Sequence, residues 1–258
     1  MLAVQIVNYR TRSYLDTCLP GVVADLEHSG LEYEINLLDN ASGERLGDLC
    51  REFAACRAFT ATRNLGFGGG HNLLASKSAA AYLMILNPDV EFIAPRTTSR
   101  LLEVLRYGEQ VQAVGPKLIT ETGAAQRWDH GRMNGLRAQI SLRAGHSYWR
   151  ATDVRQEVAW VSGAVLMVER AAFDAIGGFD ENLFLYKEDE DLCLRLRRAG
   201  GRVIYEPGVV VRHLGSVVGD RADGLERAGE YFFEKHFPNR RVRKAFEVAH
   251  RWLARVRV

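Results

Sequence analysis

The sequence lacks any apolar run long enough to cross a membrane. The longest such runs, around residues 79–86 and 158–168, fall well short of the roughly 20 residues that a spanning helix needs. A signal peptide is also lacking, because the first apolar stretch, MLAVQIV, meets Asn8 and Arg10 almost at once. We therefore expect a cytoplasmic protein.

Cysteine is scarce, and its spacing matches no common metal or redox motif. The cysteines form no CxxC pair and no His/Cys ligand pattern. In a cytosolic chain this is typical of reduced thiols rather than of a disulfide framework or a zinc site. We expect free thiols at all four positions, Cys18, Cys50, Cys56 and Cys193.

The chain carries no strong charge of either sign. Its 34 basic and 32 acidic residues leave a formal net charge of +2, which is too small to indicate nucleic acid as a general partner. Apolar residues make up 47% and charged residues 26%, as in ordinary globular proteins. At 258 residues, the chain fits one large domain, or one domain with an appendage.

The first half alternates short apolar runs with segments of helical spacing. This rhythm predicts an open, mostly parallel α/β sheet flanked by helices. The expected strands cover residues 2–9, 34–40, 58–61 and 79–86, and the expected helices cover residues 13–26, 46–58 and 70–78. Ligands bind beyond the carboxyl ends of the strands in such sheets. We expect a site at the polar residues that follow these strands, Asn8, Asp39, Asn40, Asn87 and Asp89.

The second half is less regular. We predict helices over residues 95–107, 170–181 and 188–200, and strands over residues 111–119, 157–169 and, as a pair, 201–213. Residues 120–157 are polar and rich in Arg and Gly, and we treat them as a variable excursion.

The stretch RNLGFGGGHN (63–72) is rich in glycine and precedes a predicted helix. Glycines let backbone amides approach an anion at a helix N-terminus, but a tight turn before a helix has the same composition. It is a poor dinucleotide fingerprint, because His71 stands where a third glycine is needed, and it lacks the Lys-Ser/Thr ending of a P-loop.

The acidic run EDED (188–191) opens a predicted helix, where negative charge is favourable in any case. Asp191 and Arg195 are four residues apart and can pair on the helix surface. The preceding GGFDENLFLYK is, however, better suited to a pocket wall than to a solvated face. Crowded carboxylates raise one another's pKa, and a general base needs such a pKa.

Two further residues have a structural and a functional interpretation. His213, in RHLGS, is either structural or, together with an aspartate oxygen, a ligand suited to Mn²⁺ or Mg²⁺. Trp160 is either a core residue or a ring that stacks on a sugar, with the small residues Ser162, Gly163 and Ala164 making room for the ligand.

Taken together, these stretches resemble the family 2 glycosyltransferases with the GT-A fold, especially rhamnosyltransferase-like members. The match is an ordered series over residues 2–216: VQIVNY, LLDNAS, NLGFGGGHN, LNPDV, VSGAVLMVER, GGFDENLFLYKEDEDLCLR and VRHLGS. The resemblance implies a nucleotide-sugar donor, a divalent cation (Mg²⁺ or Mn²⁺) and transfer to an acceptor hydroxyl with inversion at the anomeric carbon.

The resemblance also implies roles for individual residues. The nucleotide and its phosphates would be bound by Asn8, Tyr9, Asp39, Asn40, Arg63, Asn64 and Asn87. Asp89 matches the last carboxylate of the family's DxD metal motif, whose first position is Asn87 here, so a single carboxylate remains. His213 would help to hold the metal or diphosphate. Asp189 matches the catalytic base of the ED pair that it forms with Glu188, and Trp160 and Gly163 would contact the acceptor.

The LNPDV form resembles enzymes that use dTDP-L-rhamnose, which we prefer to a UDP-hexose as donor. The acceptor would be a saccharide or a lipid-linked saccharide in cell-surface polysaccharide synthesis. Residues 1–90 would form the nucleotide-binding half and residues 91–235 the acceptor half of one GT-A domain, 1–235. The alternatives are a nucleotidyltransferase, whose basic glycine-rich loop after the first strand is missing here, and a non-catalytic nucleotide- or carbohydrate-binding module.

Residues 236–258 predict a basic amphipathic helix. Such a helix suits peripheral contact with an anionic membrane surface, near a lipid-linked acceptor. Packing on its own domain or on a second subunit of a homodimer explains the same pattern. Its basic residues are Arg240, Arg241, Arg243, Lys244, Arg251, Arg255 and Arg257, and its apolar ones are Phe246, Val248, Ala249, Trp252, Leu253 and Val256.

Overall fold

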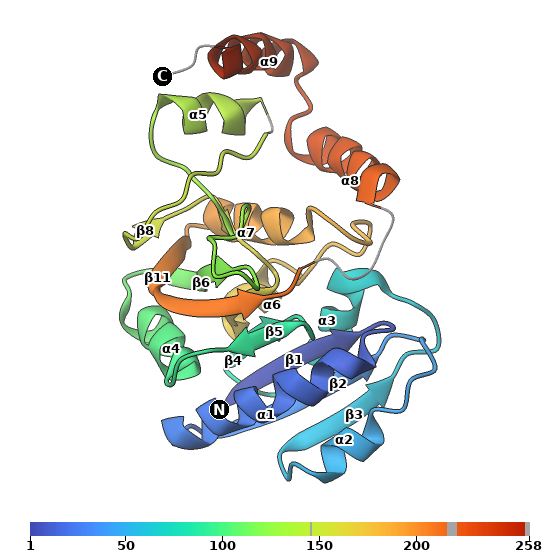
Figure 1. The fold of residues 1–258 in the computed structure, drawn as a ribbon. Helices are drawn as coiled ribbons and strands as arrows, with labels where there is room; N and C mark the ends of the chain where they lie inside the picture. Colours follow the sequence, from blue (N-terminus) through green and yellow to red (C-terminus); the bar gives the residue numbers. More distant parts are fainter. Residues whose placement is uncertain (145, 216–220, 256–258) are drawn as a thin grey trace.

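Strands and helices alternate along the chain (Figure 1). The structure is a computed structural model that describes residues 1–144, 146–215 and 221–255, without the side chains of residues 221–223, 240, 242, 243 and 251–255. The strands are β1 (Leu2–Asn8), β2 (Tyr33–Asp39), β3 (Cys56–Thr60), β4 (Tyr82–Leu86), β5 (Val90–Phe92), β6 (Val111–Ile119), β7 (His130–Gly131), β8 (Gln156–Glu157), β9 (Trp160–Val161), β10 (Val165–Glu169) and β11 (Arg202–His213). The helices are α1 (Arg12–Ser29), α2 (Gly47–Arg51), α3 (Gly66–Ser76), α4 (Thr97–Tyr107), α5 (Leu136–Arg143), α6 (Arg170–Ala175), α7 (Glu188–Arg198), α8 (Arg221–His236) and α9 (Arg240–Arg255).

One large sheet runs through the molecule in the order β3-β2-β1-β4-β10-β6-β11-β5, and β8 pairs with β11. β3, β2, β1 and β4 run parallel to one another, and β6 and β11 form a second parallel pair. β10 is antiparallel to both β4 and β6, and β5 is antiparallel to β11. The predicted α/β sheet is therefore confirmed, but it is mixed, and its uninterrupted parallel part lies in the N-terminal half.

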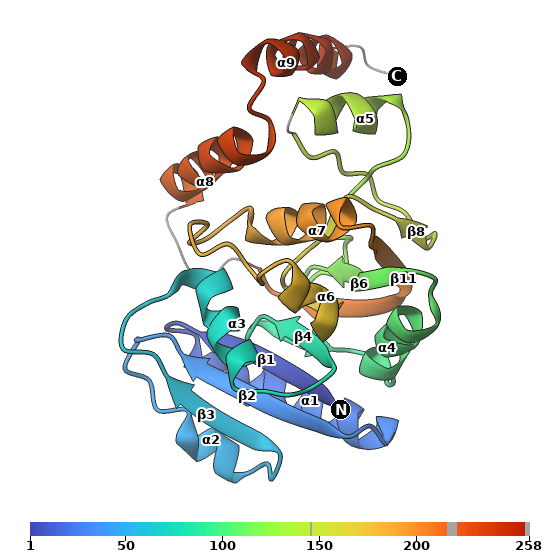
Figure 2. The same ribbon diagram turned by 180° about the vertical axis from the view of Figure 1, so that it is seen from behind.

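Helices cover both faces of this sheet because successive strand residues point to opposite faces. Leu2, Val4 and Ile6 of β1 pack with the buried residues of α1, α2 and α4. Ala3, between them, belongs to the core on the other face, with α3, α6 and α7. The two views of the ribbon show these helix layers on opposite sides of the strands (Figures 1 and 2).

The predicted strand over residues 157–169 is three short strands, β8, β9 and β10. The chain turns between β9 and β10, where the backbone N–H of Val165 donates to Ser162 O at 3.3 Å. The predicted strand pair over residues 201–213 is instead one strand, β11, with an irregularity in its pairing to β6 between Glu206 and Val210.

Two expectations about helices in the first half are wrong. The helix expected over residues 46–58 is only α2, Gly47–Arg51. The glycines expected in a turn belong to α3, where their lack of a side chain allows close packing. A Cβ on Gly70 would lie 2.8 Å from Val7 Cγ2, and a Cβ on Gly68 would lie 2.8 Å from Phe179 Cβ. These glycines bring α3 down onto the sheet.

The prediction of four free thiols is wrong for two of them. Cys50 and Cys56 form a disulfide, with their Cα atoms 4.8 Å apart. The tight turn that follows α2, in which Cys56 N donates to Phe53 O at 3.0 Å, brings the two residues together. Cys18 and Cys193 are free and buried, as expected.

Residues 120–157, expected to be a variable excursion, are tied to the sheet through Asp129, which is 2% exposed. Its Oδ1 accepts hydrogen bonds from Trp149 Nε1 and His130 Nδ1, both at 2.7 Å. Its Oδ2 accepts from Tyr205 OH at 2.9 Å and Leu118 N at 3.3 Å. We name these four donors and their acceptor the Asp129 node.

Within residues 236–258 the described chain forms one helix, α9, and a further helix, α8, precedes it without having been predicted. α9 packs against α5 at the top of the molecule in Figure 1: Ser141 Oγ lies 3.0 Å from His250 Nδ1, and the Arg143 guanidinium lies 5.6 Å from the Phe246 ring centre. Packing on its own domain, one of the alternatives above, therefore occurs. No helix in the described ranges combines the length and the apolar composition that a membrane span requires. The predicted amphipathic face depends partly on side chains outside the described set, Arg240, Arg243, Arg251, Trp252, Leu253, Arg255, Val256 and Arg257.

Candidate active site

A cavity of about 500 Å³ opens beyond the carboxyl ends of β1, β2 and β4, where the fold class predicts a ligand. Nine of the thirteen residues expected to form the site line it: Tyr9, Asn40, Asn64, Asn87, Asp89, Gly163, Glu188, Asp189 and His213. These residues come from both halves of the chain.

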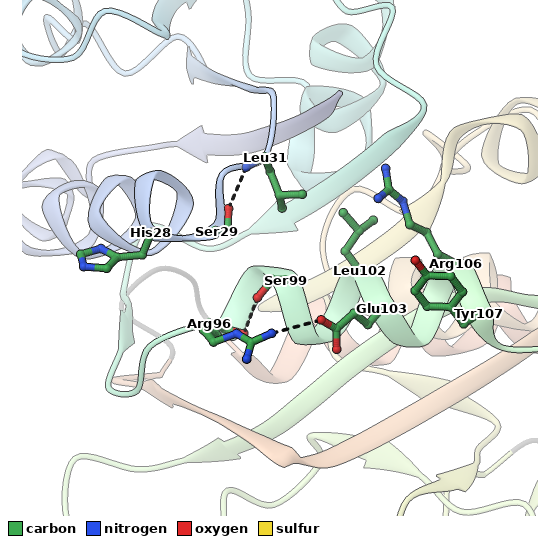
Figure 3. A pocket seen from close by; sticks show the side chains of 9 residues that line it. All are labelled: His28, Ser29, Leu31, Arg96, Ser99, Leu102, Glu103, Arg106 and Tyr107. Carbon is green, nitrogen blue, oxygen red and sulfur yellow. Dashed lines mark hydrogen bonds and ion pairs between the residues drawn. The ribbon is translucent and has the colours of Figure 1, made fainter.

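A second cavity, of about 530 Å³, lies between α1 and α4 (Figure 3). It is lined by Leu31, which precedes β2, and by Arg106 and Tyr107, which precede β6, so it lies near the amino ends of these strands. Of its charged residues, Arg96 and Glu103 lie 3.3 Å apart and pair with each other. The second cavity thus lies at the wrong end of the strands, and two of its charged side chains already pair with each other. Both facts favour the first cavity as the active site.

One corner of the first cavity joins Asp89, Asn87 and His213. His213 Nε2 lies 3.3 Å from Asp89 Oδ1 and 3.2 Å from Asn87 Nδ2. Its other ring nitrogen, Nδ1, lies 3.0 Å from Gln126 Oε1. Because that amide oxygen can only accept, Nδ1 carries a proton, and in the neutral ring Nε2 presents its lone pair to the corner, where Asn87 Nδ2 can only donate.

This corner fits a divalent cation that also binds a ligand's phosphates. The lone pair of His213 Nε2 and the Asp89 carboxylate face each other, and both residues are more than nine-tenths buried. In the described part of the chain, no group of three or more His, Cys, Asp or Glu side chains could hold a metal by itself. Mg²⁺ and Mn²⁺ commonly take the remaining ligands from phosphates and water, so two protein ligands suffice.

A second corner is built from amides at the N-terminus of α3. Asn40 Nδ2 donates to Asn64 Oδ1 and to Gly66 O, both at 3.0 Å, and Asn40 Oδ1 accepts from Leu65 N at 2.9 Å. This network fixes the loop that leads into α3, with Asn64 and Gly66 against the cavity.

Three expected nucleotide contacts lie outside the cavity lining. Asn8 is fully buried, and its Oδ1 accepts from Thr11 Oγ1 at 2.9 Å, so it positions a lining residue instead. Asp39 uses its carboxylate on the loop that follows, accepting from the backbone N–H groups of Ser42 and Gly43 at 3.1 Å. Arg63 is exposed.

Asp189 lies in the first turn of α7 and lines the same cavity as Asp89 and His213. Its Oδ2 accepts from Gly163 N at 2.9 Å and its Oδ1 from Glu190 N at 2.8 Å. Burial, followed by the negative charge of Glu190, raises the pKa of Asp189 to about 6. The carboxylate is therefore oriented by backbone groups and titrates close to neutral pH.

Gly163 allows this arrangement because it has no side chain. A Cβ on Gly163 would lie 3.1 Å from two ring atoms of Phe67, which lines the cavity. The SGA turn predicted to make room for a ligand does line the cavity, at Ser162, Gly163 and Ala164.

Trp160 is not part of the lining. It is 5% exposed, packs in the core beneath α7, and donates from Nε1 to Ser147 Oγ at 3.1 Å. Ser147 in turn donates to Glu190 Oε2 at 2.6 Å. Because the ring is almost completely buried, neither of its faces is open to stack on an acceptor sugar. Trp160 is therefore a core residue, which is the structural interpretation.

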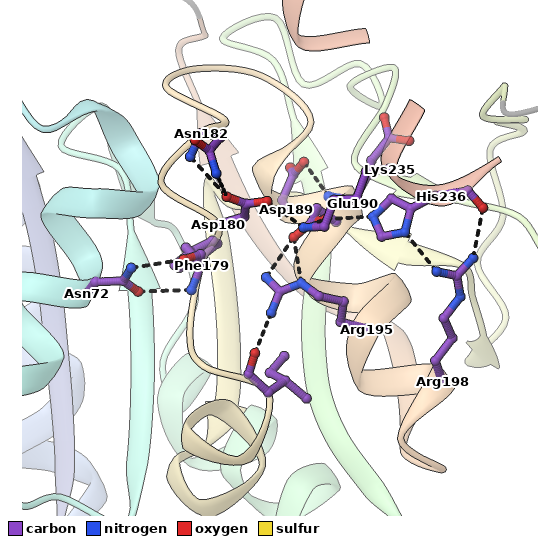
Figure 4. A network of polar contacts seen from close by, with 12 residues as sticks. Asn72, Phe179, Asp180, Asn182, Asp189, Glu190, Arg195, Arg198, Lys235 and His236 are labelled. Carbon is purple, nitrogen blue, oxygen red and sulfur yellow. Dashed lines mark hydrogen bonds and ion pairs between the residues drawn. The ribbon is translucent and has the colours of Figure 1, made fainter. Parts of the chain in front are cut away.

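The GGFDENLFLYK segment forms a cavity wall, as predicted, through Phe184, Leu185 and Tyr186. Phe184 O accepts from Phe67 N at 2.9 Å, which joins this wall to α3. Near its start, Asp180 Oδ2 accepts from Lys235 Nζ at 2.6 Å (Figure 4). The same oxygen accepts from Tyr231 OH at 2.9 Å. Both donors belong to α8, and no sequence pattern predicted this helix beside the cavity wall.

α8 also contacts α7. Lys235 Nζ and His236 Nε2 each lie 2.6 Å from Asp191 Oδ1, and Arg195 Nε donates to Asp191 Oδ2 at 2.7 Å (Figure 4). The expected pairing of Asp191 with Arg195 is confirmed. Asp191 is fully buried, and although burial opposes the shift, His236, Lys235 and Arg195 lower its pKa.

Three residues of the site were not predicted from the sequence: Thr11 and Phe67, which line the cavity, and Gln126, which contacts His213 from outside the lining. Thr11 and Phe67 carry no chemistry that distinguishes them in a sequence, and Gln126 lies in the segment that was not assigned. Their partners Asn8, Gly163 and His213 were predicted to belong to the site. What the sequence did not show is which residues lie next to these partners in space.

Comparison with known proteins identifies the family. The profile described as "Glycosyltransferase like family 2" matches residues 1–227. N-acetylglucosaminyl-diphospho-decaprenol L-rhamnosyltransferase of Mycobacterium tuberculosis is 33% identical over 144 residues, which is 51% of this chain and 46% of that protein. Rhamnosyltransferase WbbL of Escherichia coli is 26% identical over 228 residues and 83% of each chain. The chain thus spans about half the length of the mycobacterial relative and most of the other.

Solved structures share the fold. GalNAc-T7, with UDP, GalNAc and Mn²⁺, aligns with a TM-score of 0.65 at 15% identity, covering 96% of this chain and 54% of that one. The mannosyltransferase PcManGT of Pyrobaculum calidifontis, with GDP-Man and Mn²⁺, aligns at 0.61 and 14% identity, covering 100% and 76%. These likenesses establish the GT-A architecture around the cavity. Together with the profile match over residues 1–227, they show that the chain belongs to the family 2 glycosyltransferases.

Proposed function

We propose that the protein is an inverting, metal-dependent glycosyltransferase that moves L-rhamnose from dTDP-L-rhamnose to a hydroxyl of a saccharide or lipid-linked acceptor in cell-surface polysaccharide synthesis. One observation carries the proposal: a cation corner, Asp89 and His213, and an oriented carboxylate, Asp189, line the same cavity. Residues 1–90 supply the nucleotide side, and residues 91–235 supply Asp189 and the acceptor side.

Asp89 and His213 would hold the cation, with Gln126 fixing the His213 ring. When bound, a divalent cation neutralises the charge that develops on the departing nucleoside diphosphate. Tyr9, Asn40 and Asn64 lie where they can contact the nucleotide, and Asn87 adds an amide rather than a charge. Asn8 and Asp39 support this region from behind.

Asp189 acts as the general base. The acceptor oxygen forms a bond to the anomeric carbon while the bond from that carbon to the diphosphate oxygen breaks, and the electron pair leaves with the diphosphate. The hydroxyl proton passes to Asp189, whose two oxygens each keep a lone pair free after accepting one backbone N–H. A single displacement on the face opposite the leaving group inverts the configuration.

The donor preference rests on relatives. Two of the similar proteins are named rhamnosyltransferases, and the mycobacterial name includes a diphospho-decaprenol, a lipid-linked acceptor. No described residue of the cavity by itself selects rhamnose over a hexose, so the donor is decided by assay.

The test is a donor screen. Purified protein with Mn²⁺ or Mg²⁺ is incubated with dTDP-L-rhamnose, UDP-glucose, UDP-GlcNAc and GDP-mannose, and the release of nucleoside diphosphate is measured with and without a lipid-linked saccharide. Acceptor-dependent release from dTDP-L-rhamnose alone is expected. Turnover of a UDP-sugar with dTDP-L-rhamnose inert would reassign the donor, and release by Asp189→Asn at the wild-type rate would remove the proposed mechanism.

Peripheral membrane contact through α9 is part of the same proposal. Arg241 and Lys244 are exposed on this helix, while its Phe246 faces α5. Flotation with vesicles containing an anionic lipid tests it, because Arg241→Glu with Lys244→Glu should weaken binding. Wild-type protein that stays off the vesicles and elutes as a dimer would favour a second subunit instead.

A further inference from the structure

We infer that Glu188, the neighbour of the general base, acts as a neutral hydrogen-bond donor from its carboxyl O–H to an oxygen of a sugar bound in the cavity. The inference rests on the proposed function, since it needs a sugar in this cavity. It gives the two carboxyl groups of the ED pair different tasks.

The surroundings of Glu188 differ from those of Asp189. Glu188 is the first residue of α7, lines the cavity and is 6% exposed. Its Oε2 is buried and has no hydrogen-bond partner among the residues that the structure describes. Asp189, by contrast, accepts two backbone N–H groups. The backbone N–H of Glu188 itself favours the charged form of its carboxyl, but this does not offset the burial of the group. A buried carboxylate with an unpartnered oxygen is disfavoured, whereas a neutral carboxyl needs only an acceptor for its O–H.

The charges around Glu188 act in the same direction. On its own helix it has Asp189, Glu190 and Asp191, and the nearby cation, Lys187 Nζ, is held by Glu190 Oε1 at 2.6 Å. The other titratable groups of the described lining are Tyr9, Asp89, Tyr186 and His213. A divalent cation at Asp89 would carry two positive charges, and the diphosphate of a bound nucleotide-sugar would neutralise them with its two negative charges. With metal and donor bound, the site would therefore offer Glu188 no net positive charge.

Burial, and then the negative charge of Asp189, raise the pKa of Glu188 well above its usual value. When the environment pushes the pKa values of neighbouring carboxyls apart, one serves as acid or donor and the other as base. Asp189, with a pKa of about 6, is mostly ionised at neutral pH and can take a proton. Glu188 keeps its proton and can hold a sugar oxygen beside the reacting hydroxyl.

The variant Glu188→Gln tests whether Glu188 acts as a neutral hydrogen-bond donor or as a charged carboxylate. Glutamine keeps the shape and a donor but does not titrate, so kcat/KM at neutral pH should remain within about threefold of wild type, since the donated hydrogen bond persists. Glu188→Ala removes the donor and should lose on the order of 100-fold or more, as sites built around a hydrogen bond do. Varying donor and acceptor sugars in turn shows, from the KM that rises, which sugar Glu188 contacts.

The pH profile adds a readout that a structural role would not change. Wild-type kcat/KM should fall at alkaline pH as Glu188 ionises, and Glu188→Gln should lose that alkaline limb. Glu190→Gln, which removes a charge from the same helix without lining the cavity, should keep it. A folded Glu188→Gln variant as inactive as Asp189→Asn, or one that keeps the alkaline limb, would overturn the inference while leaving the transferase assignment in place.

Thermal unfolding distinguishes failure of the inference from failure of the proposed function. A carboxyl whose folded-state pKa is raised stabilises the fold while protonated, and that stability is lost as pH rises through the raised pKa. The Tm of wild type should therefore fall relative to that of Glu188→Gln as the pH rises above about 5, where glutamate ionises in the unfolded chain. This difference is expected even if no donor in the screen turns over, and parallel Tm curves would show that Glu188 is not held neutral.

Discussion

His213 Nε2 lies 3.3 Å from Asp89 Oδ1 because two distant segments pair as antiparallel strands. β11 places His213 opposite Val90 of β5, the residue directly after Asp89, and Leu214 N donates to Asp89 O at 3.0 Å. The sheet itself therefore builds the corner, and neither side chain depends on a long loop for its place.

The first prediction concerns metal affinity at this corner. Asp89→Asn removes the only carboxylate there and should weaken Mn²⁺ binding, measured by calorimetry with nucleoside diphosphate present, by more than the roughly 10- to 100-fold typical of losing an outer-shell partner. Gln126→Leu, which touches only the far side of the His213 ring, should fall within that smaller range. Equal affinity for wild type and Asp89→Asn would place the metal elsewhere.

The second prediction adds a carboxylate. Asn87 Nδ2 already lies 3.2 Å from His213 Nε2, so Asn87→Asp would put a second anionic oxygen beside the same ring. Calorimetry should show tighter Mn²⁺ binding than in wild type, because hard divalent cations prefer carboxylate oxygens. Unchanged or weaker binding would mean that the Asn87 side chain does not face the metal.

The third prediction is an acid limb in the pH profile. Asp189 must be ionised to accept the acceptor proton, so kcat should fall as pH drops through about 6, the value to which burial and Glu190 raise its pKa. Asp189→Asn should lose roughly 100- to 10,000-fold in kcat across the whole range, the usual contribution of a positioned base. A wild-type profile that stays flat down to pH 5 would argue for another base.

The sequence predicted those parts of the site that depend on residue type and chain order. Asp89 and His213 follow strands, so their place at one edge of the sheet agrees with the rule for ligand sites. Asp189 opens a helix, and it was proposed from its acidic run and from the family resemblance. The predicted acceptor contact of Trp160 was not met, because a tryptophan suits a core and a sugar site equally well. Only the burial of its side chain distinguishes the two roles. The prediction that the glycines of α3 form a turn was wrong, because these glycines pack closely on Val7 and Phe179, which lie far away in the chain.

The contacts of α8 could not be predicted for the same reason. Lys235 and His236 look like ordinary polar residues at the end of a helix, and their partners Asp180 and Asp191 lie about 45 to 55 positions earlier. No local pattern encodes a pairing over that separation.

The fourth prediction tests the Asp129 node. Asp129→Ala leaves four donors, including Tyr205 OH and Trp149 Nε1, without their acceptor inside the protein. Each buried unsatisfied group costs about 1–3 kcal/mol, so urea denaturation should show a loss of several kcal/mol. Tyr205→Phe removes one donor with its hydrogen bond and should cost only about 1 kcal/mol. Similar losses for the two variants would contradict the central role of Asp129.

The fifth prediction concerns Asp180, which ties the cavity wall to α8. Burial alone would raise the pKa of Asp180, but hydrogen bonds from Lys235, the Asn182 backbone, Tyr231 and the Asn182 side chain hold it well below its usual value. A depressed carboxyl pKa stabilises the fold above the unfolded pKa, and this stability is lost as pH falls through the folded pKa. Wild type should therefore lose stability below about pH 4 more steeply than Asp180→Asn, as followed by thermal melts.

Asp180→Asn should also affect ligand binding, because the wall that begins at Asp180 carries Phe184 and Tyr186 into the cavity. At neutral pH the lost ion pair with Lys235 should cost about 1–2 kcal/mol of unfolding free energy, and the donor KM should rise while metal affinity stays unchanged. Tyr231→Phe is the matched control, since it removes one hydrogen bond to the same oxygen and keeps the ion pair, at about 1 kcal/mol. If Asp180→Asn left both stability and donor KM at wild-type values, α8 would be packed beside the wall without fixing it.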